Sequence, residues 1–274
     1  MTRSEHGVDM SGAFADIALG GPSGQGFWDT TNRRLFMFDH ALGGFPISTG
    51  ERGIKSAATP RYICDNFRDA AVDTAIWTLN SGTDAQAVDP AILATSQIGE
   101  CNLVTGNVGS GMAADGSSMV SALDIEAEEG EINLVGQIKL SAITTVWFFF
   151  GLTDLVTLEA PVTLSTTTFT TNATDACGIM FDTAATTDTI RAVGVANNVD
   201  ATHVDTTIAP VAATYMDVRI RVSTVGKMDV WLDGVWRGAV SSAVTPSVNL
   251  GVILAADART TASRTLTSNL IGMM

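Results

Sequence analysis

The chain is poor in basic residues. It has 15 Lys and Arg against 29 Asp and Glu, which gives a formal net charge of −14 at pH 7. Between Asp115 and Asp205 only Lys139 and Arg191 are basic. Binding to nucleic acid or to an anionic membrane surface depends on clustered Lys and Arg. The sequence therefore predicts neither as a partner, and the acidity is typical of a protein that stays in solution at high concentration or high salt.

Cysteine and long apolar runs are also scarce. Cys64, Cys101 and Cys177 are widely spaced and odd in number, so neither a disulfide framework nor a zinc-ligand spacing is present. We expect reduced, buried thiols, as in a cytoplasm. The N-terminal stretch lacks the apolar segment of a secretory signal. The most apolar run, residues 142–152, is much shorter than the roughly 20 residues of a membrane helix and predicts a strand buried on both faces.

Motifs of catalysis are missing as well. The chain has three histidines, His6, His40 and His203, and no Gly-x-Ser-x-Gly elbow. The glycine-rich run at residues 106–111 does not match a dinucleotide fingerprint and is typical of a hairpin loop. From these observations the sequence predicts no catalytic residues, no cofactor and no metal.

Strand patterns, in contrast, are plentiful. From residue 217 to 222 and again from 228 to 232, apolar and polar residues alternate, which places the apolar ones on one face of each strand. The predicted core residues of this meander are Val218, Ile220, Val222, Val230 and Leu232. A Gly-containing connection and the dipeptide Asp233-Gly234 are both signals for tight turns between antiparallel strands.

Similar short runs continue over most of the chain. The predicted strands are 62–67, 102–105, 119–126, 132–140, 145–152, 178–182, 190–196, 216–223, 228–232, 235–240, 248–254 and 264–271. Their connections are rich in Gly, Asn, Asp and Pro, no fixed repeat is visible, and only residues 69–77 suggest a short helix. The predicted fold class is all-β, an antiparallel two-layer sandwich.

Residues 1–60 differ in texture, because they are Gly-rich with small apolar islands. Such a stretch cannot easily form a core of its own. We predict an extended N-terminal arm over 1–60 and one sandwich domain over 61–274. The arm would contact a neighbour through Phe27, Trp28, Phe36 and Phe38, and a frayed terminus is the alternative.

A family resemblance covers roughly residues 62–274. The features that carry it are the opening Asp65-Asn66-Phe67, Trp77, the strand end FFFGLTD at 148–154 and the hairpin MDVWLDGV at 228–235. Their order resembles concanavalin A-like (laminin G-like) jelly-roll sandwiches, particularly those of tailed-phage virion proteins. The fold hosts lectins, glycosidases and capsid components, so it does not settle the function.

The resemblance implies a structural role. The expected function is a capsid decoration (cement) protein without enzymatic activity, made in the host bacterial cytoplasm and located on the virion. Its expected partners are the major capsid protein and copies of itself in a homotrimer. The alternatives are a carbohydrate-binding module of a phage tail or fibre, with surface glycans as partners, and, less favoured, a jelly-roll glycoside hydrolase.

An acidic run is the sharpest candidate for the hydrolase alternative. On a strand, Asp124, Glu126 and Glu128 would share one face at roughly 6.6 Å spacing. Jelly-roll glycosidases carry Glu-x-Asp-x-Glu in this way, whereas here the first acid is Asp and the central one is Glu. The following Glu129-Gly130-Glu131 is typical of a charged turn, so a solvated strand end is the favoured interpretation.

Two further groups of residues are open to a binding role. The loop acids Asp182, Asp188 and Asp200 have oxygen ligands of the kind that calcium takes, but no alternating Asp-x-Asp-x-Asp-Gly loop is present. Trp147 lies inside an apolar run and is predicted to be core. Trp231 shares its strand face with acidic residues, so we expect it on the outer face, either at an interface or ligand surface or packed under a loop.

Overall fold

The computed structural model describes three N-terminal strands and residues 63–273, apart from residues 95, 97 and 98. The chain divides into two compact units, Met1–Ser56 and Ala57–Met274. In the first unit, β1 (Gly26–Asp29), β2 (Arg34–Asp39) and β3 (Gly43–Ile47) form an antiparallel sheet in that order. The rest of the predicted arm, and the side chains of Phe27, Trp28, Phe36 and Phe38, lie outside the described residues.

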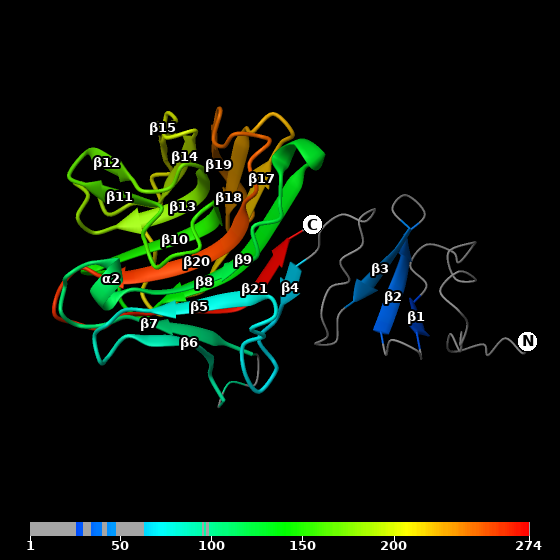
Figure 1. Cartoon of the computed structure of the whole chain (residues 1–274), viewed down its shortest axis with the longest axis horizontal. Helices are drawn as coiled ribbons and strands as arrows, with labels where there is room; N and C mark the ends of the chain where they lie inside the picture. Colours follow the sequence, from blue (N-terminus) through cyan, green and yellow to red (C-terminus); the bar gives the residue numbers. More distant parts are fainter. Residues whose placement is uncertain are drawn as a thin grey trace, which may run out of the picture. The chain divides into compact units, whose positions relative to one another are not determined.

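The second unit contains two large antiparallel sheets (Figure 1). The first, called the β10 sheet, has the order β15 (Val199–Asp200), β14 (Arg191–Ala196), β13 (Ala176–Asp182), β10 (Val146–Thr153), β20 (Gly251–Ala258), β8 (Ser117–Ser121) and β5 (Trp77–Ser81), with β16 (Val204–Asp205) also paired to β14. The second, called the β9 sheet, has the order β19 (Val235–Val240), β18 (Met228–Leu232), β17 (Met216–Val222), β9 (Ile132–Leu140), β21 (Thr265–Met273), β7 (Cys101–Val104) and β6 (Val88–Ile92), with β4 (Ile63–Asp65) also paired to β21.

Three small elements complete the unit. They are the hairpin of β11 (Val162–Ser165) and β12 (Thr168–Thr171), the one-turn helix α2 (Met112–Asp115) and the 3₁₀ turn η1 (Ala127–Glu129). Within the described residues no helix is long and apolar enough to cross a bilayer. The antiparallel two-layer sandwich predicted from the sequence is therefore confirmed.

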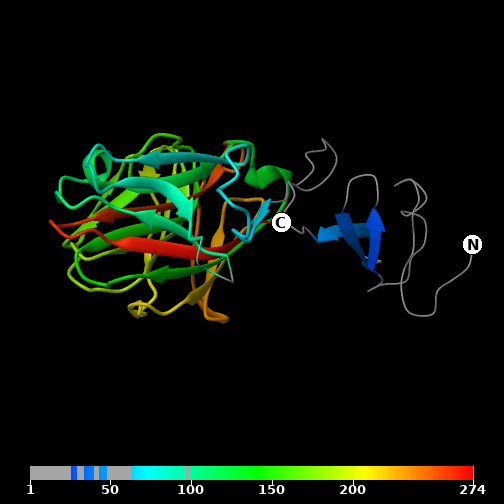
Figure 2. The ribbon, with the colours of Figure 1, turned by 90° about the horizontal axis from the view of Figure 1, so that it is seen from below.

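The main core lies between the two sheets, which are stacked face to face (Figure 2). Phe148 and Phe150 of β10 point into it from one layer, and Leu134 and Ile220 of the β9 sheet point into it from the other. The apolar face predicted for residues 217–232 is buried, with Val218, Ile220, Val222, Val230 and Leu232 all at 2% exposure or less. Alternation along each strand thus supplies one apolar layer per sheet.

Two glycine-containing positions explain local features of the β9 sheet. A Cβ on Gly136 would lie 2.5 Å from the Phe150 ring, so this glycine lets β9 and β10 approach each other across the core. At the turn between β18 and β19, Asp233 and Gly234 have φ values of 50° and 74°. This left-handed pair is the geometry of a two-residue hairpin turn, as the sequence predicts.

The sequence-based strand assignments miss several elements. β5, β6, β11 and β12 are not anticipated, and the expected helix near residues 69–77 is wrong, because bends and a turn lead there into β5. β6 contains Pro90 and reaches its partner β7 through a register shift, so neither its composition nor its pairing follows the usual strand pattern. These short edge elements are held by tertiary contacts rather than by their own periodicity.

Candidate functional site

The outer face of the β10 sheet is closed. All eight residues of β10 are buried, because its side chains alternate between the main core and a second apolar cluster. Trp147 and Phe149 point into that second cluster, where Val162 and Leu164 of the β11–β12 hairpin cover them. Trp147 is 0% exposed and its indole N–H donates to the Val162 carbonyl at 3.0 Å, so the prediction of a core Trp147 is confirmed.

The outer face of the β9 sheet is open by comparison. Along β9 every second residue is half-buried, and along β17 Asp217 and Arg219 are exposed while their neighbours are buried. The strand pattern is the same as in β10, but the outward positions carry polar side chains and no second apolar layer of described residues covers them. A ligand that reached this molecule could therefore contact the β9 sheet directly.

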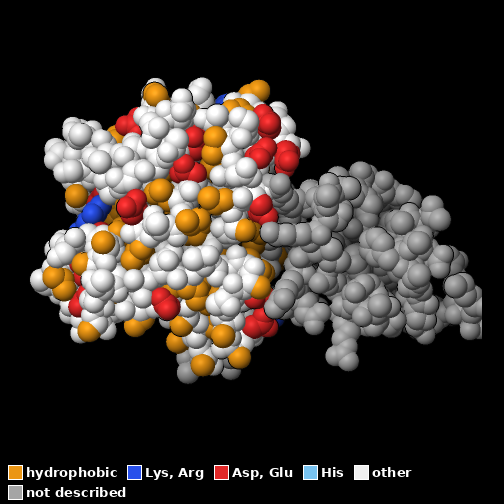
Figure 3. All heavy atoms as spheres, viewed as in Figure 1, with side chains coloured by type: hydrophobic (Ala, Val, Ile, Leu, Met, Phe, Trp, Pro, Cys, Tyr) orange, Lys and Arg blue, Asp and Glu red, His pale blue; other side chains and the backbone are white. Residues whose placement is uncertain are grey.

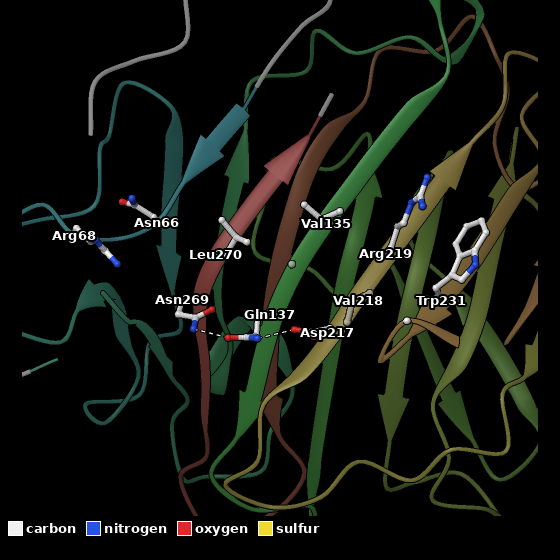
Figure 4. Close-up of a pocket in the computed structure, with 12 residues that line it drawn as sticks. Asn66, Arg68, Val135, Gln137, Asp217, Val218, Arg219, Trp231, Asn269 and Leu270 are labelled. Carbon is white, nitrogen blue, oxygen red and sulfur yellow. Dashed lines mark hydrogen bonds between the residues drawn. The ribbon is translucent and has the colours of Figure 1, made fainter. Parts of the chain in front are cut away.

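A groove of about 720 Å³ runs across this open face (Figure 4). Strands β9, β17, β18 and β21 form its floor, and residues after β4 and at the β18–β19 turn form its ends. The residues that line it are Asn66, Arg68, Val135, Gly136, Gln137, Asp217, Val218, Arg219, Trp231, Gly234, Asn269 and Leu270. Its size lies in the range of ordinary ligand pockets, roughly 300–1,000 Å³.

A chain of hydrogen bonds crosses the middle of the groove. The Asn269 side-chain amide donates to Gln137 Oε1 at 2.5 Å, and the Gln137 amide donates to Asp217 Oδ1 at 2.6 Å (Figure 4). The orientation of Gln137 is thereby fixed from both sides. Asp217 Oδ2 accepts no hydrogen bond from a described residue, so it remains available to a donor in the groove. Asn269 Oδ1 is likewise buried without a partner within the described part of the chain.

Trp231 and Arg219 form one side of the groove (Figure 4). The two residues are register partners on β18 and β17, and the Arg219 guanidinium lies 4.9 Å from the centre of the Trp231 ring. Arg219 Nη2 also donates to Asn133 Oδ1 at 2.9 Å. Trp231 is half-buried and lies on the outer face, as expected from its strand position.

The neighbouring arginine on the same strand face has a different environment. Arg221 Nη2 lies 2.7 Å from Asp229 Oδ2, and this hydrogen bond raises the pKa of Arg221. Burial opposes the ionisation of Asp229, but hydrogen bonds from Arg221 and Trp236 hold the pKa of Asp229 below its usual value. Arg221 is therefore a neutralised cation, whereas Arg219 forms no ion pair with any described carboxylate.

The acidic run predicted as a possible catalytic strand does not lie on a strand. β8 ends at Ser121, Ile125 forms an isolated bridge with Leu250, and η1 follows. Asp124, Glu126 and Glu128 therefore do not share one strand face, and the predicted strand 119–126 is wrong beyond Ser121. The interpretation as a strand end followed by a turn fits this backbone, because a run of Glu-Gly-Glu favours a turn over a continued ladder.

The acids considered for calcium are engaged elsewhere or lie on different elements. Asp182 is the buried last residue of β13 and accepts hydrogen bonds from Arg259, Asp188 lies in the β13–β14 connection, and Asp200 in β15 accepts from the Thr171 hydroxyl. No group of three or more His, Cys, Asp or Glu side chains in the described regions is arranged to hold a metal ion. Among the thiols, burial raises the pKa of Cys101 to about 12, so this thiol stays protonated at neutral pH.

Sequence reasoning found Trp231 but missed most of the groove. Gln137 and Asn269 come from strands more than a hundred residues apart, and Asn66 and Arg68 come from a loop. The sequence did offer one signal. Gln137 and Asp217 are polar residues between core residues of an alternating strand, so their side chains are expected on the outer face of the sheet. Which outward residues become neighbours depends on strand order, which one sequence does not specify.

Comparison with known proteins identifies structures with a similar fold. No protein-family model and no curated protein sequence matches the chain. Among solved structures, Bacillus licheniformis β-glucanase aligns with a TM-score of 0.54 at 11% identity, covering 79% of this chain and 99% of that one. An endo-1,3-β-glucanase from Streptomyces sioyaensis gives a TM-score of 0.52 at 10% identity, covering 80% and 98%. A β-1,3-1,4-glucanase (lichenase) derived from a mouse hindgut metagenome gives 0.52 at 10% identity, covering 77% and 98%.

These neighbours establish the concanavalin A-like jelly-roll fold and correct two predictions from the sequence. The predicted capsid decoration role and the predicted lack of enzymatic activity are contradicted, because these three similar structures are glucanases and none of them is a virion protein. At these identities the likeness extends to the fold alone. The homotrimer, the contact with a major capsid protein and the virion location stay predictions that the structure does not test.

Proposed function

We propose that this chain is a carbohydrate-active jelly roll that binds a polysaccharide in the groove on the β9 sheet. The observation that carries the proposal is the Asn269–Gln137–Asp217 hydrogen-bond chain beside Trp231 on an open sheet face. A sugar ring presents hydroxyl donors and acceptors around an apolar C–H face. A groove that combines fixed amides, a carboxylate and an aromatic side chain matches both features.

Each part of the groove has a separate role in this proposal. Asp217 Oδ2 accepts from sugar hydroxyls, while Gln137 holds Oδ1 in place at 2.6 Å. Trp231 supplies an aromatic wall, and Val135 and Leu270 supply apolar contact on the floor. The groove is open along the sheet, so a polymer can lie across it without threading its end through a tunnel.

Hydrolysis of the bound glycan is the second candidate, and the glucanase neighbours favour it. Glycosidases act through carboxyl groups that flank the scissile bond. Among the described residues that line the groove, Asp217 is the one acid. It would serve as one proton donor or acceptor, and the second carboxyl group of such a mechanism would come from outside these lining residues. Binding is therefore tested at Trp231 and hydrolysis at Asp217, with different readouts.

Calorimetric titration with β-1,3 and mixed-linkage glucan oligosaccharides tests the binding proposal. We expect Trp231→Ala to weaken binding by roughly tenfold, equivalent to about 1.4 kcal/mol. Trp236→Ala is the matched control, because Trp236 is the register neighbour of Trp231 but is 55% exposed and does not line the groove. Equal binding by wild type and Trp231→Ala would overturn the proposal, and so would the failure of every glycan tested to bind.

Release of reducing ends from the same glucans tests the hydrolytic candidate. Asp217→Asn keeps the shape of the side chain and its contact with Gln137 but removes the carboxylate. We expect a loss of roughly 100-fold in rate, the usual contribution of a general acid or base. Undiminished release by Asp217→Asn would show that hydrolysis does not depend on this groove. No release by the wild type would rule out hydrolysis of these glucans and leave the binding proposal.

A further inference from the structure

The described cations fall into two classes. Lys139, Arg191, Arg221, Lys227 and Arg259 each form an ion pair with a carboxylate. The remaining cations form none with a described residue, and these are Arg68, Arg219, Arg237 and Arg264. Two of these, Arg68 and Arg219, line the groove, where Figure 4 places them toward opposite ends.

Basic residues are scarce in this protein. The chain has a net charge of −14, and acidic side chains outnumber basic ones on the face drawn in Figure 3. Most cations in such a molecule find a carboxylate nearby, as Arg221 does. A groove with two arginines outside any ion pair therefore has a local charge that differs in sign from that of the whole chain.

Arg219 is held in place without being neutralised. Asn133 Oδ1 accepts from its Nη2 at 2.9 Å, and the Trp231 ring lies 4.9 Å from its Cζ. An amide oxygen and an aromatic ring orient the guanidinium, but neither carries a formal negative charge. Most of its five N–H donors stay available, in the planar fork that suits a carboxylate.

Arg221 provides an internal comparison. It lies two residues further along β17 on the same face, and its guanidinium also approaches the Trp231 ring, at 5.6 Å. Its charge is met by Asp229 at 2.7 Å and by Glu131 at 4.0 Å. The two arginines thus share a strand, a face and an aromatic neighbour, and differ in whether a protein carboxylate already occupies the fork.

Asp217 determines how far from it a negatively charged group of a ligand binds in the groove. Asp217 and Arg219 lie two residues apart on one strand face, roughly 6.6 Å along β17. Sugar hydroxyls can donate to Asp217 while an acidic substituent meets Arg219, without the two negative charges sharing one position. The groove therefore distinguishes a hydroxyl-binding point from an anion-binding point.

We propose that the glycan bound in this groove carries carboxylates, as uronic-acid polysaccharides do, and that Arg219 binds one of them. This inference rests on the proposed function, because it assigns a substrate class to the same groove. A carboxylate on the guanidinium fork forms paired charge-assisted hydrogen bonds. Arg68 supplies a second cation toward the other end of the groove, so an extended polyanion gains from both.

The test compares one oligosaccharide in two charge states. Oligogalacturonate and the same oligomer after reduction of its carboxyl groups to alcohols are titrated into wild type, Arg219→Gln, Arg219→Lys and Arg221→Gln. Wild type is expected to bind the acidic form roughly tenfold more tightly, the discrimination given by about 1.4 kcal/mol. Arg219→Gln removes this preference, Arg219→Lys retains part of it, and Arg221→Gln, the matched control, retains it. High salt narrows the preference, because exposed charges are screened.

Three other outcomes are decisive. Equal binding of the acidic and the reduced oligomer by wild type would overturn the carboxylate assignment while the groove still bound glycan. A preference lost equally in Arg219→Gln and Arg221→Gln would overturn the role of Arg219. Failure of both oligomers and of the neutral glucans to bind would overturn the proposed function itself.

Discussion

The outer faces of the β10 sheet and the β9 sheet differ, although the strands of both sheets alternate inward and outward side chains. The outer face of the β10 sheet is covered, and that of the β9 sheet is open. On β10 the outward positions are Trp147 and Phe149, and a second apolar cluster covers them. On β9 the outward positions include Asn133 and Gln137, which are half-buried, and Gln137 lines the groove. A covered face adds apolar burial to stability, whereas an open face leaves hydrogen-bonding groups for a ligand. Substitutions on the first face should therefore change stability, and those on the second should change binding.

Truncation of an aromatic residue on each face gives the largest expected contrast. Phe149→Ala should lower the free energy of unfolding by about 3–5 kcal/mol, because it leaves a cavity in a fully packed cluster. Trp231→Ala should lower the free energy of unfolding by only about 1 kcal/mol or less, because the Trp231 side chain is half-buried and removing it loses less buried apolar area. Urea unfolding of both variants measures the difference, and similar losses at the two sites would show that the β9 face is as closed as the β10 face.

Removal of the cation that pairs with two buried carboxylates on the closed face comes next. Arg259 lies 2.6 Å from Asp182 and 3.2 Å from Asp257, and both carboxylates have side chains exposed by 1% or less. Arg259→Met leaves these charges unpaired, which we expect to cost about 2–3 kcal/mol after allowance for the partial exposure of Arg259. An unfolding free energy within about 0.5 kcal/mol of wild type would contradict a role of Arg259 in holding this face together.

The same cluster predicts a pH dependence of stability. Burial, with added repulsion from Asp115 and Asp182, raises the pKa of Asp257 to about 7 despite the nearby Arg259. A carboxyl whose folded pKa exceeds its unfolded value of 3.8 binds its proton more tightly in the folded state. Its contribution is fully present below about pH 4 and is lost as the pH rises toward 7.

Asp257→Asn should therefore flatten the stability profile between about pH 4 and 7. At pH 8 the variant should be more stable than wild type by roughly 1–2 kcal/mol, since it no longer buries this charge. Thermal or urea unfolding across the pH range measures the profile. An unchanged slope in the variant would show that Asp257 does not titrate in this window.

The smallest effect separates the two arginines of the open face. Arg221→Gln removes the ion-pair partner of the buried Asp229 and should lower the free energy of unfolding slightly. Arg219→Gln removes an exposed cation that pairs with no described carboxylate and should stay within about 0.5 kcal/mol of wild type. If Arg219→Gln were the more destabilising of the two, Arg219 would be a structural cation rather than one reserved for a ligand.

The sequence predicted the sandwich better than it predicted the site. Alternation at residues 217–232 identified core positions correctly, because burial of one strand face depends on local periodicity. The groove depends on β9 lying between β17 and β21, a strand order that comes from non-local pairing. The alternation therefore marked Gln137 as an outward polar position, but nothing local placed Gln137 and Asn269 in one groove. For the acidic run at 124–128, the predicted strand was too long because β8 ends at Ser121, whereas the favoured interpretation as a strand end and turn fits the backbone.

The most direct test of the account is a map of where a glycan protects the protein. Hydrogen–deuterium exchange with and without a saturating oligogalacturonate, and in parallel with a mixed-linkage glucan, reports on each strand separately. We predict slower exchange in β9, β17, β18 and β21, with β10, β13 and β20 unchanged. Protection confined to β10, β13 or the β11–β12 hairpin would contradict the assignment of the β9 face as the ligand surface.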